Sequence, residues 1–387
     1  MEKIKRLDIA TTQGAAGQLV RESQFVFNYQ TSNPACGIAL TMPLRSQSYA
    51  ANILPGVLRQ NLPEGYLNEW IRSRFGKVTH LDDMAMLAIT GRDVIGRVRA
   101  LQETDDGHQR PKGEHLQTLL TWKGTEDLFA HLAEQYALAS GISGVQPKIV
   151  MPLSQDRSKN NIDKLSLKEE SVIVKSSGKD FPGLAENEYH CMTIARLAGL
   201  QVPSFWLSDD KKLFVVELFY LSELGYLGFE DMTALMNKQN DQKYDSSYEM
   251  VAKAVGLFSS EQYRAESLKR LFETIVLSAL LRNGDAHLKN FGLVYTDPTT
   301  KDVRLSPAYD LVNTTVYIPK DTLALRLNKS KAWPTEKQLV DFGGRHCLVG
   351  RPAEVIDRIQ TAVMAYRVAE PTELWRQMRL EIEKAAF

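Results

Sequence analysis

Four polar side chains that could do chemistry are crowded into six residues between two apolar segments. Asp285, His287, Lys289 and Asn290 lie within LLRNGDAHLKNFGLVY, which spans residues 280–295. The leucine-rich start is typical of a helix end, and the apolar run that closes the stretch is typical of a strand. Polar groups between two buried apolar elements cost free energy unless they form hydrogen bonds or serve a function. The cluster is therefore a candidate functional site.

The spacing of Asp285 and Asn290 indicates phosphoryl transfer. An Asp, four residues and then an Asn is the pattern of a protein-kinase catalytic loop. There the Asp carboxylate accepts the proton of an attacking hydroxyl, and the Asn oxygen binds a Mg²⁺ held against the phosphates. Both residue types are also common in solvated turns, so the spacing alone leaves a simple polar turn open. The apolar flanks favour the functional interpretation.

The remaining parts of such a site occur in the expected order. Asp310, in LSPAYDLVNT, follows Asn290 by twenty residues and is a candidate second Mg²⁺ ligand. Lys175 ends the β-branched run of SVIVKSS and resembles the lysine that neutralises the α- and β-phosphates. Glu188, on the helix that follows, is preferred over Glu186 as the partner of this lysine. Each also has an ordinary interpretation, as a turn residue, an edge-strand lysine or an acidic helix start.

A loop that contains glycines is a candidate phosphate-binding loop. SGISGVQPK contains Gly141 and Gly144, which let backbone N–H groups approach an anion. It is not GxGxxG, and the sequence has no GxxxxGK followed by Ser or Thr, which argues against a Walker-type NTPase. VVELF is a candidate hinge, where the backbone of Glu217 and Phe219 would bind adenine.

The elements that must position these residues are mainly strands in the first part and mainly helices from about residue 228. This order predicts an α+β protein in two lobes. We find no internal repeat and no low-complexity tract. The predicted helices lie at 62–76, 81–91, 184–200 and 265–281, the strands at 147–153, 171–177 and 213–221, and an exposed linker at 102–127.

Composition excludes several functional classes. Lys+Arg and Asp+Glu each number 47 in 387 residues, so the zero net charge does not support a general nucleic-acid or membrane binder. Three distant cysteines without CxxC spacing indicate neither a zinc site nor a disulfide framework. The N-terminus lacks an apolar signal-peptide core, and no apolar run is long enough to span a bilayer. We expect a soluble cytoplasmic protein.

Several longer motifs resemble one known family. SGVQPK, ENEYHCMTIARLAGLQVP, GDAHLKNFGL and LSPAYDLVN together resemble the HipA-type toxin kinases of bacterial toxin–antitoxin systems. NLPEG and MLAITGRDVIG resemble the small N-terminal subdomain of that family. The resemblance covers nearly the whole chain. It implies a bilobal kinase-like fold, with an N-terminal subdomain at 1–105, a β-rich N-lobe at 106–220 and a helical C-lobe at 221–387.

The resemblance also implies an activity, cofactors and partners. It implies a serine/threonine-protein kinase that uses ATP and Mg²⁺, with Asp285 as catalytic base and Asn290 and Asp310 as metal ligands. Described targets in the family are aminoacyl-tRNA synthetases, and the usual partner is a helix-turn-helix antitoxin that carries the DNA contacts. We expect no membrane partner. The expected nucleotide-binding residues are Gly141, Ser143, Gly144, Val145, Gln146, Lys148, Lys175, Glu188, Glu217 and Phe219.

The chain departs from related sequences in two places. Family members often carry an autophosphorylated serine where this chain has Gly141, so Ser143 is the preferred autophosphorylation site and Ser140 the fallback. Phosphorylation there would add about −1.5 to −2 charge beside the phosphate loop and oppose ATP binding; a loop serine that only bonds backbone is the alternative. The His-Arg before the base of ordinary kinases is replaced by Asn283 and Gly284, so activation by a phosphorylated loop is not expected.

His287 and Lys289 are candidates for orienting Asp285 or the γ-phosphate, although His287 could instead hold the turn. Two other functions remain open. GDAHLKN is similar to the G-D-x-H-x-x-N loop of aminoglycoside and choline phosphotransferases, from which phosphorylation of a protein would distinguish this chain. The other is a catalytically silent regulator that binds an antitoxin. The presence of Lys175, Asp285, Asn290 and Asp310 argues against a silent protein.

Overall fold

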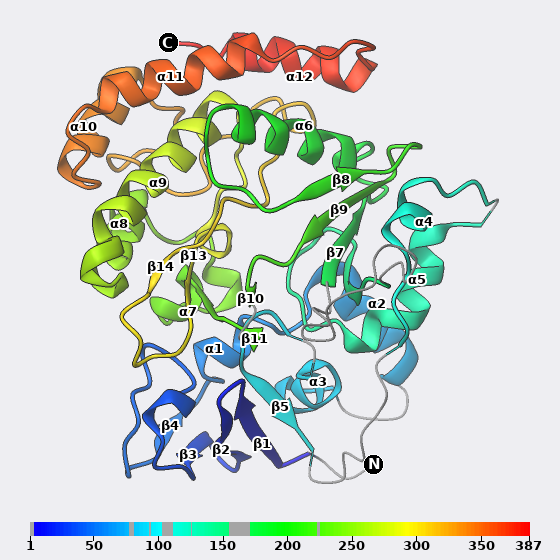
Figure 1. Ribbon diagram of the computed structural model, residues 1–387, viewed down its shortest axis with the longest axis vertical. Helices are drawn as coiled ribbons and strands as arrows, with labels where there is room; N and C mark the ends of the chain where they lie inside the picture. The colour runs from blue at the N-terminus through cyan, green and yellow to red at the C-terminus, as the bar shows by residue number, and fades with distance from the viewer. Residues whose placement is uncertain are drawn as a thin grey trace, which may run out of the picture. The chain divides into compact units, whose positions relative to one another are not determined.

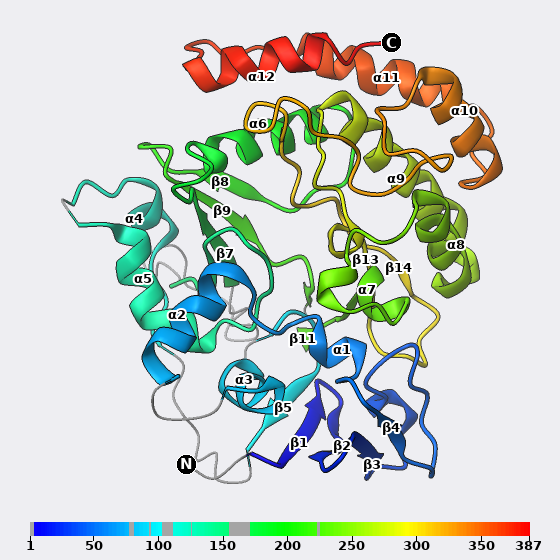
Figure 2. The same cartoon turned by 180° about the vertical axis from the view of Figure 1, so that it is seen from behind.

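The computed structural model describes residues 4–76, 81–92, 94–102, 111–124, 126–154, 171–222 and 225–387. The chain forms two compact units, each discontinuous in sequence. Unit 1 contains Met1–Gly178, Phe205–Glu230 and Tyr295–Thr300, and unit 2 contains Lys179–Ser204, Asp231–Val294 and Lys301–Phe387. Figure 1 and Figure 2 show the elements of both units from opposite sides.

The first sheet of unit 1 is antiparallel, with the strand order β4-β3-β2-β1-β5. Its strands alternate between buried and exposed side chains, so Leu7, Ile9, Leu19 and Phe27 form one apolar core with three helices. These elements are β1 (Arg6–Thr11), β2 (Gly14–Arg21), β3 (Phe25–Tyr29), η1 (Pro34–Cys36), β4 (Tyr49–Ala51), α1 (Gly56–Arg59), α2 (Gly65–Phe75), α3 (Asp83–Thr90) and β5 (Arg99–Leu101).

The second sheet of unit 1 is also antiparallel, in the order β6-β7-β9-β8. α4 and α5 lie next to β7 in both views (Figure 1, Figure 2), and Leu132 and Tyr136 of α5 share a core with Ile149, Val172 and Val215 of the sheet. The strands of this sheet are β6 (Lys148–Pro152), β7 (Ser171–Ser176), β8 (Phe205–Leu207) and β9 (Leu213–Glu217), and the helices before it are α4 (Leu116–Leu120), α5 (Leu128–Tyr136) and η2 (Ala137–Ala139). After the sheet, β10 (Leu221–Ser222) and β11 (Gly225–Tyr226) pair with each other, and β12 (Gly228–Asp231) lies outside the sheet.

Unit 2 is mainly helical and is organised around α9, which packs against α8, α10 and α11. α11 and α12 also contact α6, and both views show them running one after the other along it (Figure 1, Figure 2). The elements are α6 (Leu184–Leu197), α7 (Met232–Leu235), η3 (Asn240–Gln242), α8 (Tyr248–Phe258), α9 (Glu261–Leu280), η4 (Leu288–Asn290), β13 (Gly292–Tyr295), β14 (Arg304–Leu305), α10 (Glu336–Arg345), α11 (Pro352–Ala365) and α12 (Glu373–Glu383).

The predicted α+β class is confirmed, as are the predicted helices and the strands that became β6 and β7. The strand expected at the end of the polar stretch is present as β13. Two predictions were wrong in detail. The linker or exposed loop predicted at 102–127 contains α4, although residues 103–110 and 125 lie outside the described ranges, and the strand predicted at 213–221 ends at Glu217. Within the described ranges, every helix is too short or too polar to cross a bilayer.

Candidate active site

The segment that carries Asp285, His287, Lys289 and Asn290, called the polar loop from here on, begins where α9 ends. Arg282 adopts a left-handed backbone with φ 55°, and the amide of Asn283 donates to the carbonyl of Ser278 at 2.8 Å. The buried Asn283 side chain then accepts a hydrogen bond from the amide of Asp285 at 3.0 Å. The chain therefore reverses directly after the helix, and its own side-chain contacts fix the backbone of Asp285.

Gly284 fits this reversal because neighbouring atoms leave no room for a side chain at this position. A Cβ at this position would collide with the carboxyl group of Asp321 and would lie 2.7 Å from the carbonyl oxygen of Thr322. The amide of Gly284 donates to Oγ1 of Thr314 at 2.8 Å. Close packing therefore explains why glycine precedes the candidate base.

Asp285 is accessible from solvent, since 47% of its side chain is exposed. Its Oδ1 accepts a hydrogen bond of 2.6 Å from the hydroxyl of Tyr244. A half-exposed carboxylate on a fixed backbone can accept the proton of an incoming hydroxyl. This geometry suits the role of general base that the sequence predicts.

His287 is buried beside this base and carries no charge near neutral pH. Burial lowers the pKa of His287 to about 3, and the positive charge of Lys243 adds to the effect. Among the described residues, none forms a hydrogen bond with its Nδ1. Its ring packs edge-on against Tyr244, with 5.0 Å between centroids. His287 therefore fits a structural part of the turn better than a cation that binds phosphate.

Asn290 and Asp310 lie together on neighbouring segments of unit 2. Asn290 Nδ2 donates to the carbonyl of Asp310 at 3.4 Å, and the Tyr309 hydroxyl donates to the carbonyl of Lys289 at 2.7 Å. Asn290 Oδ1 is buried, and no group in the described part of the chain donates a hydrogen bond to it. A buried amide oxygen of this kind is costly unless a cation or donor arrives to bind it.

Lys289 directs its ammonium group to Oδ1 of Asn240, at 3.4 Å. This contact ties the polar loop to the segment between α7 and α8. The interaction is compatible with a positioning role for Lys289, whereas the predicted contact with a γ-phosphate stays a prediction.

α6 is held against the segment that carries Asp310. The side chain of Asn187 donates to the Asn313 carbonyl at 2.9 Å and accepts from the Asn313 amide at 2.7 Å. One turn of α6 also carries the two candidate glutamates. Glu186 accepts a hydrogen bond of 2.9 Å from Thr372 at the start of α12, whereas Glu188 is 1% exposed. The predicted pairing of Glu188 with Lys175 stays a prediction.

Two buried lysines face each other in unit 1. Lys148 of β6 is the cross-strand partner of Lys175 of β7, and both are buried. Directly opposed positions place the two lysine side chains on the same face of the sheet. Lys148 also packs against Gly144, since a Cβ on that glycine would collide with the lysine ammonium group. The two lysines and the glycine loop therefore form one candidate phosphate-binding surface.

The two loop serines differ in environment. Ser140 is fully buried, donates to the Tyr136 carbonyl at 2.7 Å and accepts from the Val150 amide at 2.9 Å, so it joins α5 to β6. Ser143 as a whole is only partly buried, but its Oγ is buried and lacks a hydrogen-bond partner within the described residues. Modification of Ser140 would break the hydrogen bonds that join α5 to β6, whereas the Ser143 hydroxyl makes no hydrogen bond of this kind in the described part of the chain.

The rest of the candidate phosphate-binding loop and the candidate hinge make both backbone and side-chain contacts. Gly141 forms a parallel bridge with Val94, Val145 is 63% exposed, and Gln146 donates to the Ser176 carbonyl at 3.3 Å. At the hinge, Glu217 ends β9 as the partner of Val172, and the Phe219 ring packs edge-on against Phe229. All of these residues belong to unit 1, as do Lys148 and Lys175, whereas Glu188 and the polar loop belong to unit 2.

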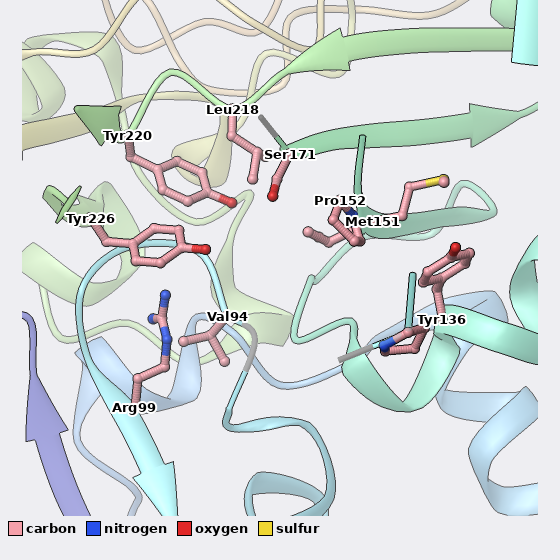
Figure 3. A pocket seen from close by; sticks show the side chains of 11 residues that line it. Val94, Arg99, Tyr136, Met151, Pro152, Ser171, Leu218, Tyr220 and Tyr226 are labelled. Atoms are coloured by element: carbon pink, nitrogen blue, oxygen red, sulfur yellow. The ribbon is translucent and has the colours of Figure 1, made fainter. Parts of the chain in front are cut away.

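A small cavity of about 30 Å³ lies next to the hinge in unit 1 (Figure 3). Leu218 and Tyr220 line it, together with Arg99, whose guanidinium group lies 4.4 Å from the ring centroid of Tyr226. A cavity of this size holds about two water molecules.

The donor set of unit 2 suits Mg²⁺ better than a transition metal. The described residues contain no cluster of three His, Cys, Asp or Glu side chains able to hold an ion. Mg²⁺ typically binds one or two protein oxygens, with phosphate oxygens and water completing its shell. The open Oδ1 of Asn290 and the carboxylate of Asp310 fit that pattern.

Sequence analysis missed three residues that complete the site. Tyr244 contacts the candidate base, Tyr309 braces the loop, and Asn283 orients its backbone. Asn283 lies within the quoted motif, and its position before a Gly-Asp turn was an available signal. Tyr244 is distant in sequence, so no local pattern could identify it.

Comparison with known structures defines the class of fold. A chain from the Shewanella oneidensis MR-1 complex of the toxin–antitoxin proteins HipA and HipB with operator DNA aligns with a TM-score of 0.63. The alignment covers 98% of this chain and 97% of that chain at 14% identity, a level that shows the fold alone. The two chains therefore share a fold.

The family follows from sequence comparison. The profile of the HipA-like C-terminal domain matches residues 140–367, and that of the HipA N-terminal domain matches residues 7–101. This chain belongs to the HipA family, which confirms the predicted resemblance.

Two curated relatives carry provisional kinase names. Y4dM of Sinorhizobium fredii is 30% identical over 299 residues, and a Haemophilus influenzae protein is 28% identical over 227 residues. The matches cover 72% and 54% of this chain, and 67% and 62% of the relatives' own lengths.

Proposed function

We propose that this protein is an ATP- and Mg²⁺-dependent serine/threonine-protein kinase and the toxin of a bacterial toxin–antitoxin pair. The observation that carries the proposal is the buried Oδ1 of Asn290, which has no donor among the described residues and belongs to the same short loop as the half-exposed Asp285. The carbonyl of Asp310 holds the other end of that amide. An open metal ligand beside a proton acceptor is what phosphoryl transfer to a hydroxyl requires.

Each residue of the polar loop has a definite task in this proposal. Asp285 accepts the proton of the acceptor hydroxyl. The hydroxyl oxygen bonds to the γ-phosphorus as the bond between that phosphorus and ADP breaks. Asn290 and Asp310 would hold Mg²⁺, which would neutralise charge on the phosphates. Lys289 braces the loop through Asn240, and His287 fills the turn as a neutral ring.

Unit 1 would bind the nucleotide. Lys148 and Lys175 would neutralise the phosphates, with Glu188 as the partner of Lys175. The backbone of Glu217 and Phe219 would bind adenine. The loop residues Gly141, Ser143, Gly144, Val145 and Gln146 would lie over the phosphates.

Ser143 is the proposed autophosphorylation site. Its hydroxyl has no hydrogen-bond partner in the described structure, and the adjacent Gly144 packs against the Lys148 ammonium group. A phosphate at this position would add about −1.5 to −2 charge and compete with ATP for the lysines. Ser140 is disfavoured because its hydroxyl links α5 to β6.

The proposed partners follow from family membership. The Shewanella relative was solved with HipB and operator DNA, which supports a helix-turn-helix antitoxin as partner and contact with DNA through it. The formal net charge of zero is consistent with a protein that relies on a partner for DNA binding. The protein substrate would be a translation component such as an aminoacyl-tRNA synthetase. We also propose the division of the chain into an N-terminal subdomain at 1–105, an N-lobe at 106–220 and a C-lobe at 221–387.

Labelled ATP tests the proposal directly. Purified protein, Mg²⁺ and γ-labelled ATP are added to a cytosolic extract, with Asp285→Asn as the control. We expect a labelled extract protein that is absent with the variant, because loss of a positioned base costs about 10²–10⁴-fold in rate. Label on the protein itself, mapped to Ser143, would locate the autophosphorylation site.

The same experiment separates the competing functions. Asp285→Asn must still bind nucleotide, which Mg²⁺-ATP-dependent thermal stabilisation would measure. Full activity in that variant would overturn the assignment of the base. Transfer of label only to a sugar or amino alcohol would indicate a small-molecule phosphotransferase. No transfer to any acceptor, with the antitoxin still bound, would indicate a silent regulator.

A further inference from the structure

The segment between α7 and α8 passes directly over the polar loop. The carbonyl of Lys243 accepts a hydrogen bond from the Leu288 amide at 3.1 Å. Three residues later, the amide of Arg326 donates to the Ser246 carbonyl at 3.3 Å, and the Tyr248 amide donates to the Arg326 carbonyl at 2.9 Å. The backbone on both sides of Tyr244 is therefore anchored to other parts of unit 2.

From this anchored backbone, the side chain of Tyr244 reaches the candidate base. Its hydroxyl donates to Oδ1 of Asp285 at 2.6 Å. The centroid of its ring lies 5.0 Å from that of His287, and the two ring planes make an angle of 71°. This is an edge-to-face contact, which a neutral imidazole can make. The hydroxyl and the ring are thus both held in place, and the hydroxyl points at the carboxylate.

We propose that the Tyr244 hydroxyl occupies the place of the acceptor hydroxyl at Oδ1 of Asp285, so that a substrate reaches this oxygen only by displacing it. This inference rests on the proposed role of Asp285 as the base. A general base accepts a hydrogen bond from the hydroxyl that it will deprotonate. The Tyr244 hydroxyl makes that bond at an ordinary length for a charged acceptor.

The side chain, and not the backbone, is the part that moves. Tyr244 is 40% exposed, so its ring can rotate towards solvent about the Cα–Cβ bond. The hydrogen bonds of Lys243 and Ser246 need not break during this rotation. An acceptor would therefore exchange one hydroxyl for another at the carboxylate without refolding the segment.

This arrangement makes Tyr244 a determinant of acceptor binding. The hydrogen bond from Tyr244 competes with every acceptor for Oδ1 of Asp285. The apparent affinity for an acceptor therefore falls as the fraction of molecules with this hydrogen bond rises. An acceptor segment that also binds the surface around the loop would offset this competition. Water lacks such additional contacts, so the tyrosine also limits hydrolysis of ATP.

The test compares wild type with Tyr244→Phe, which keeps the ring contact and removes the hydroxyl. Dephosphorylated casein is the acceptor probe, and ATP hydrolysis is measured in its absence. We expect KM for casein to fall about three- to tenfold at an unchanged kcat, and ATP hydrolysis without casein to rise by a similar factor. Tyr244→Leu, which removes ring and hydroxyl together, should change KM in the same direction.

Tyr263→Phe is the matched control, because Tyr263 is a partly buried tyrosine of α9 whose ring faces Arg304. It should leave both rates unchanged. A lower kcat in Tyr244→Phe at constant KM would show that the tyrosine orients the base, and would overturn the proposal. Unchanged kinetics would also overturn it, as would phosphate found on Tyr244 itself. Wild type inactive in both assays would instead reject the proposed kinase function, and this inference with it.

Discussion

Replacing Gly284 with alanine should damage the polar loop without touching any side chain of the candidate site. The added Cβ would collide with the Asp321 carboxyl group and lie 2.7 Å from the Thr322 carbonyl oxygen. The carboxyl group can rotate away, but the neighbouring backbone cannot easily follow. The Trp333 indole donates to the Asp321 carbonyl at 3.0 Å and holds that segment. The loop that carries Asp285 must therefore move instead.

The size of the effect follows from these contacts. Forcing an extra methyl group into a packed site typically costs about 1–3 kcal/mol. For a unit of this size, each kcal/mol lowers the melting temperature by about 2–4 °C. A displacement of about 1 Å at a reacting group can cost roughly 10²-fold in rate. We therefore expect Gly284→Ala to be modestly less stable and much less active.

The assay measures thermal unfolding and transfer of labelled phosphate for the same preparations. Gly344→Ala is the matched control, because nothing lies within 4 Å of its added Cβ and the residue belongs to α10. In that helix alanine should stabilise by up to about 1 kcal/mol and leave transfer unchanged. If Gly284→Ala behaved like the control, the close packing of the polar loop would be refuted.

Two other predictions address the metal site and the buried imidazole. Asn290→Ala should raise the Mg²⁺ concentration for half-maximal phosphate transfer by about 10–100-fold, with Mg²⁺-free nucleotide binding unchanged; an unaltered Mg²⁺ titration would rule out this ligand. The folded pKa of His287 is about 3, below its ordinary value near 6.5, so between these values the unfolded state binds a proton that the folded state excludes. Stability should therefore fall as pH drops below 6.5, by about 1.4 kcal/mol per unit from this residue. His287→Gln should flatten urea-unfolding stability between pH 7 and pH 5, and a retained slope would contradict the assignment.

Local patterns were sufficient to predict the linear parts of the site. Asp285 and Asn290 share one turn, so their spacing in sequence already determines that they are neighbours. The pairing of Lys148 with Lys175 was not predicted, since it depends on the register of β6 against β7. The contact of Tyr244 with the base depends on how a distant segment crosses the loop, which hydrophobic periodicity does not encode.

Backbone strain at the site is only weakly encoded in the sequence, because Asp adopts the left-handed conformation more often than most residues whereas Arg does not. Arg282 and Asp310 have φ of 55° and 56°, where a non-glycine residue costs about 1–2 kcal/mol. Glycine would remove that cost at both positions but would also remove the side chain.

The neighbours of each strained residue offset its cost. The carbonyl of Arg282 accepts two hydrogen bonds of 3.1 Å from Thr314, and its guanidinium group lies 5.0 Å from the Trp333 ring centroid. The carbonyl of Asp310 accepts from Asn290. That bond turns the amide so that its oxygen stays open for a cation. The backbone carbonyl of Asp310 therefore orients the amide of Asn290, while its side chain is the other proposed metal ligand. A glycine at this position would keep the first contact and lose the carboxylate.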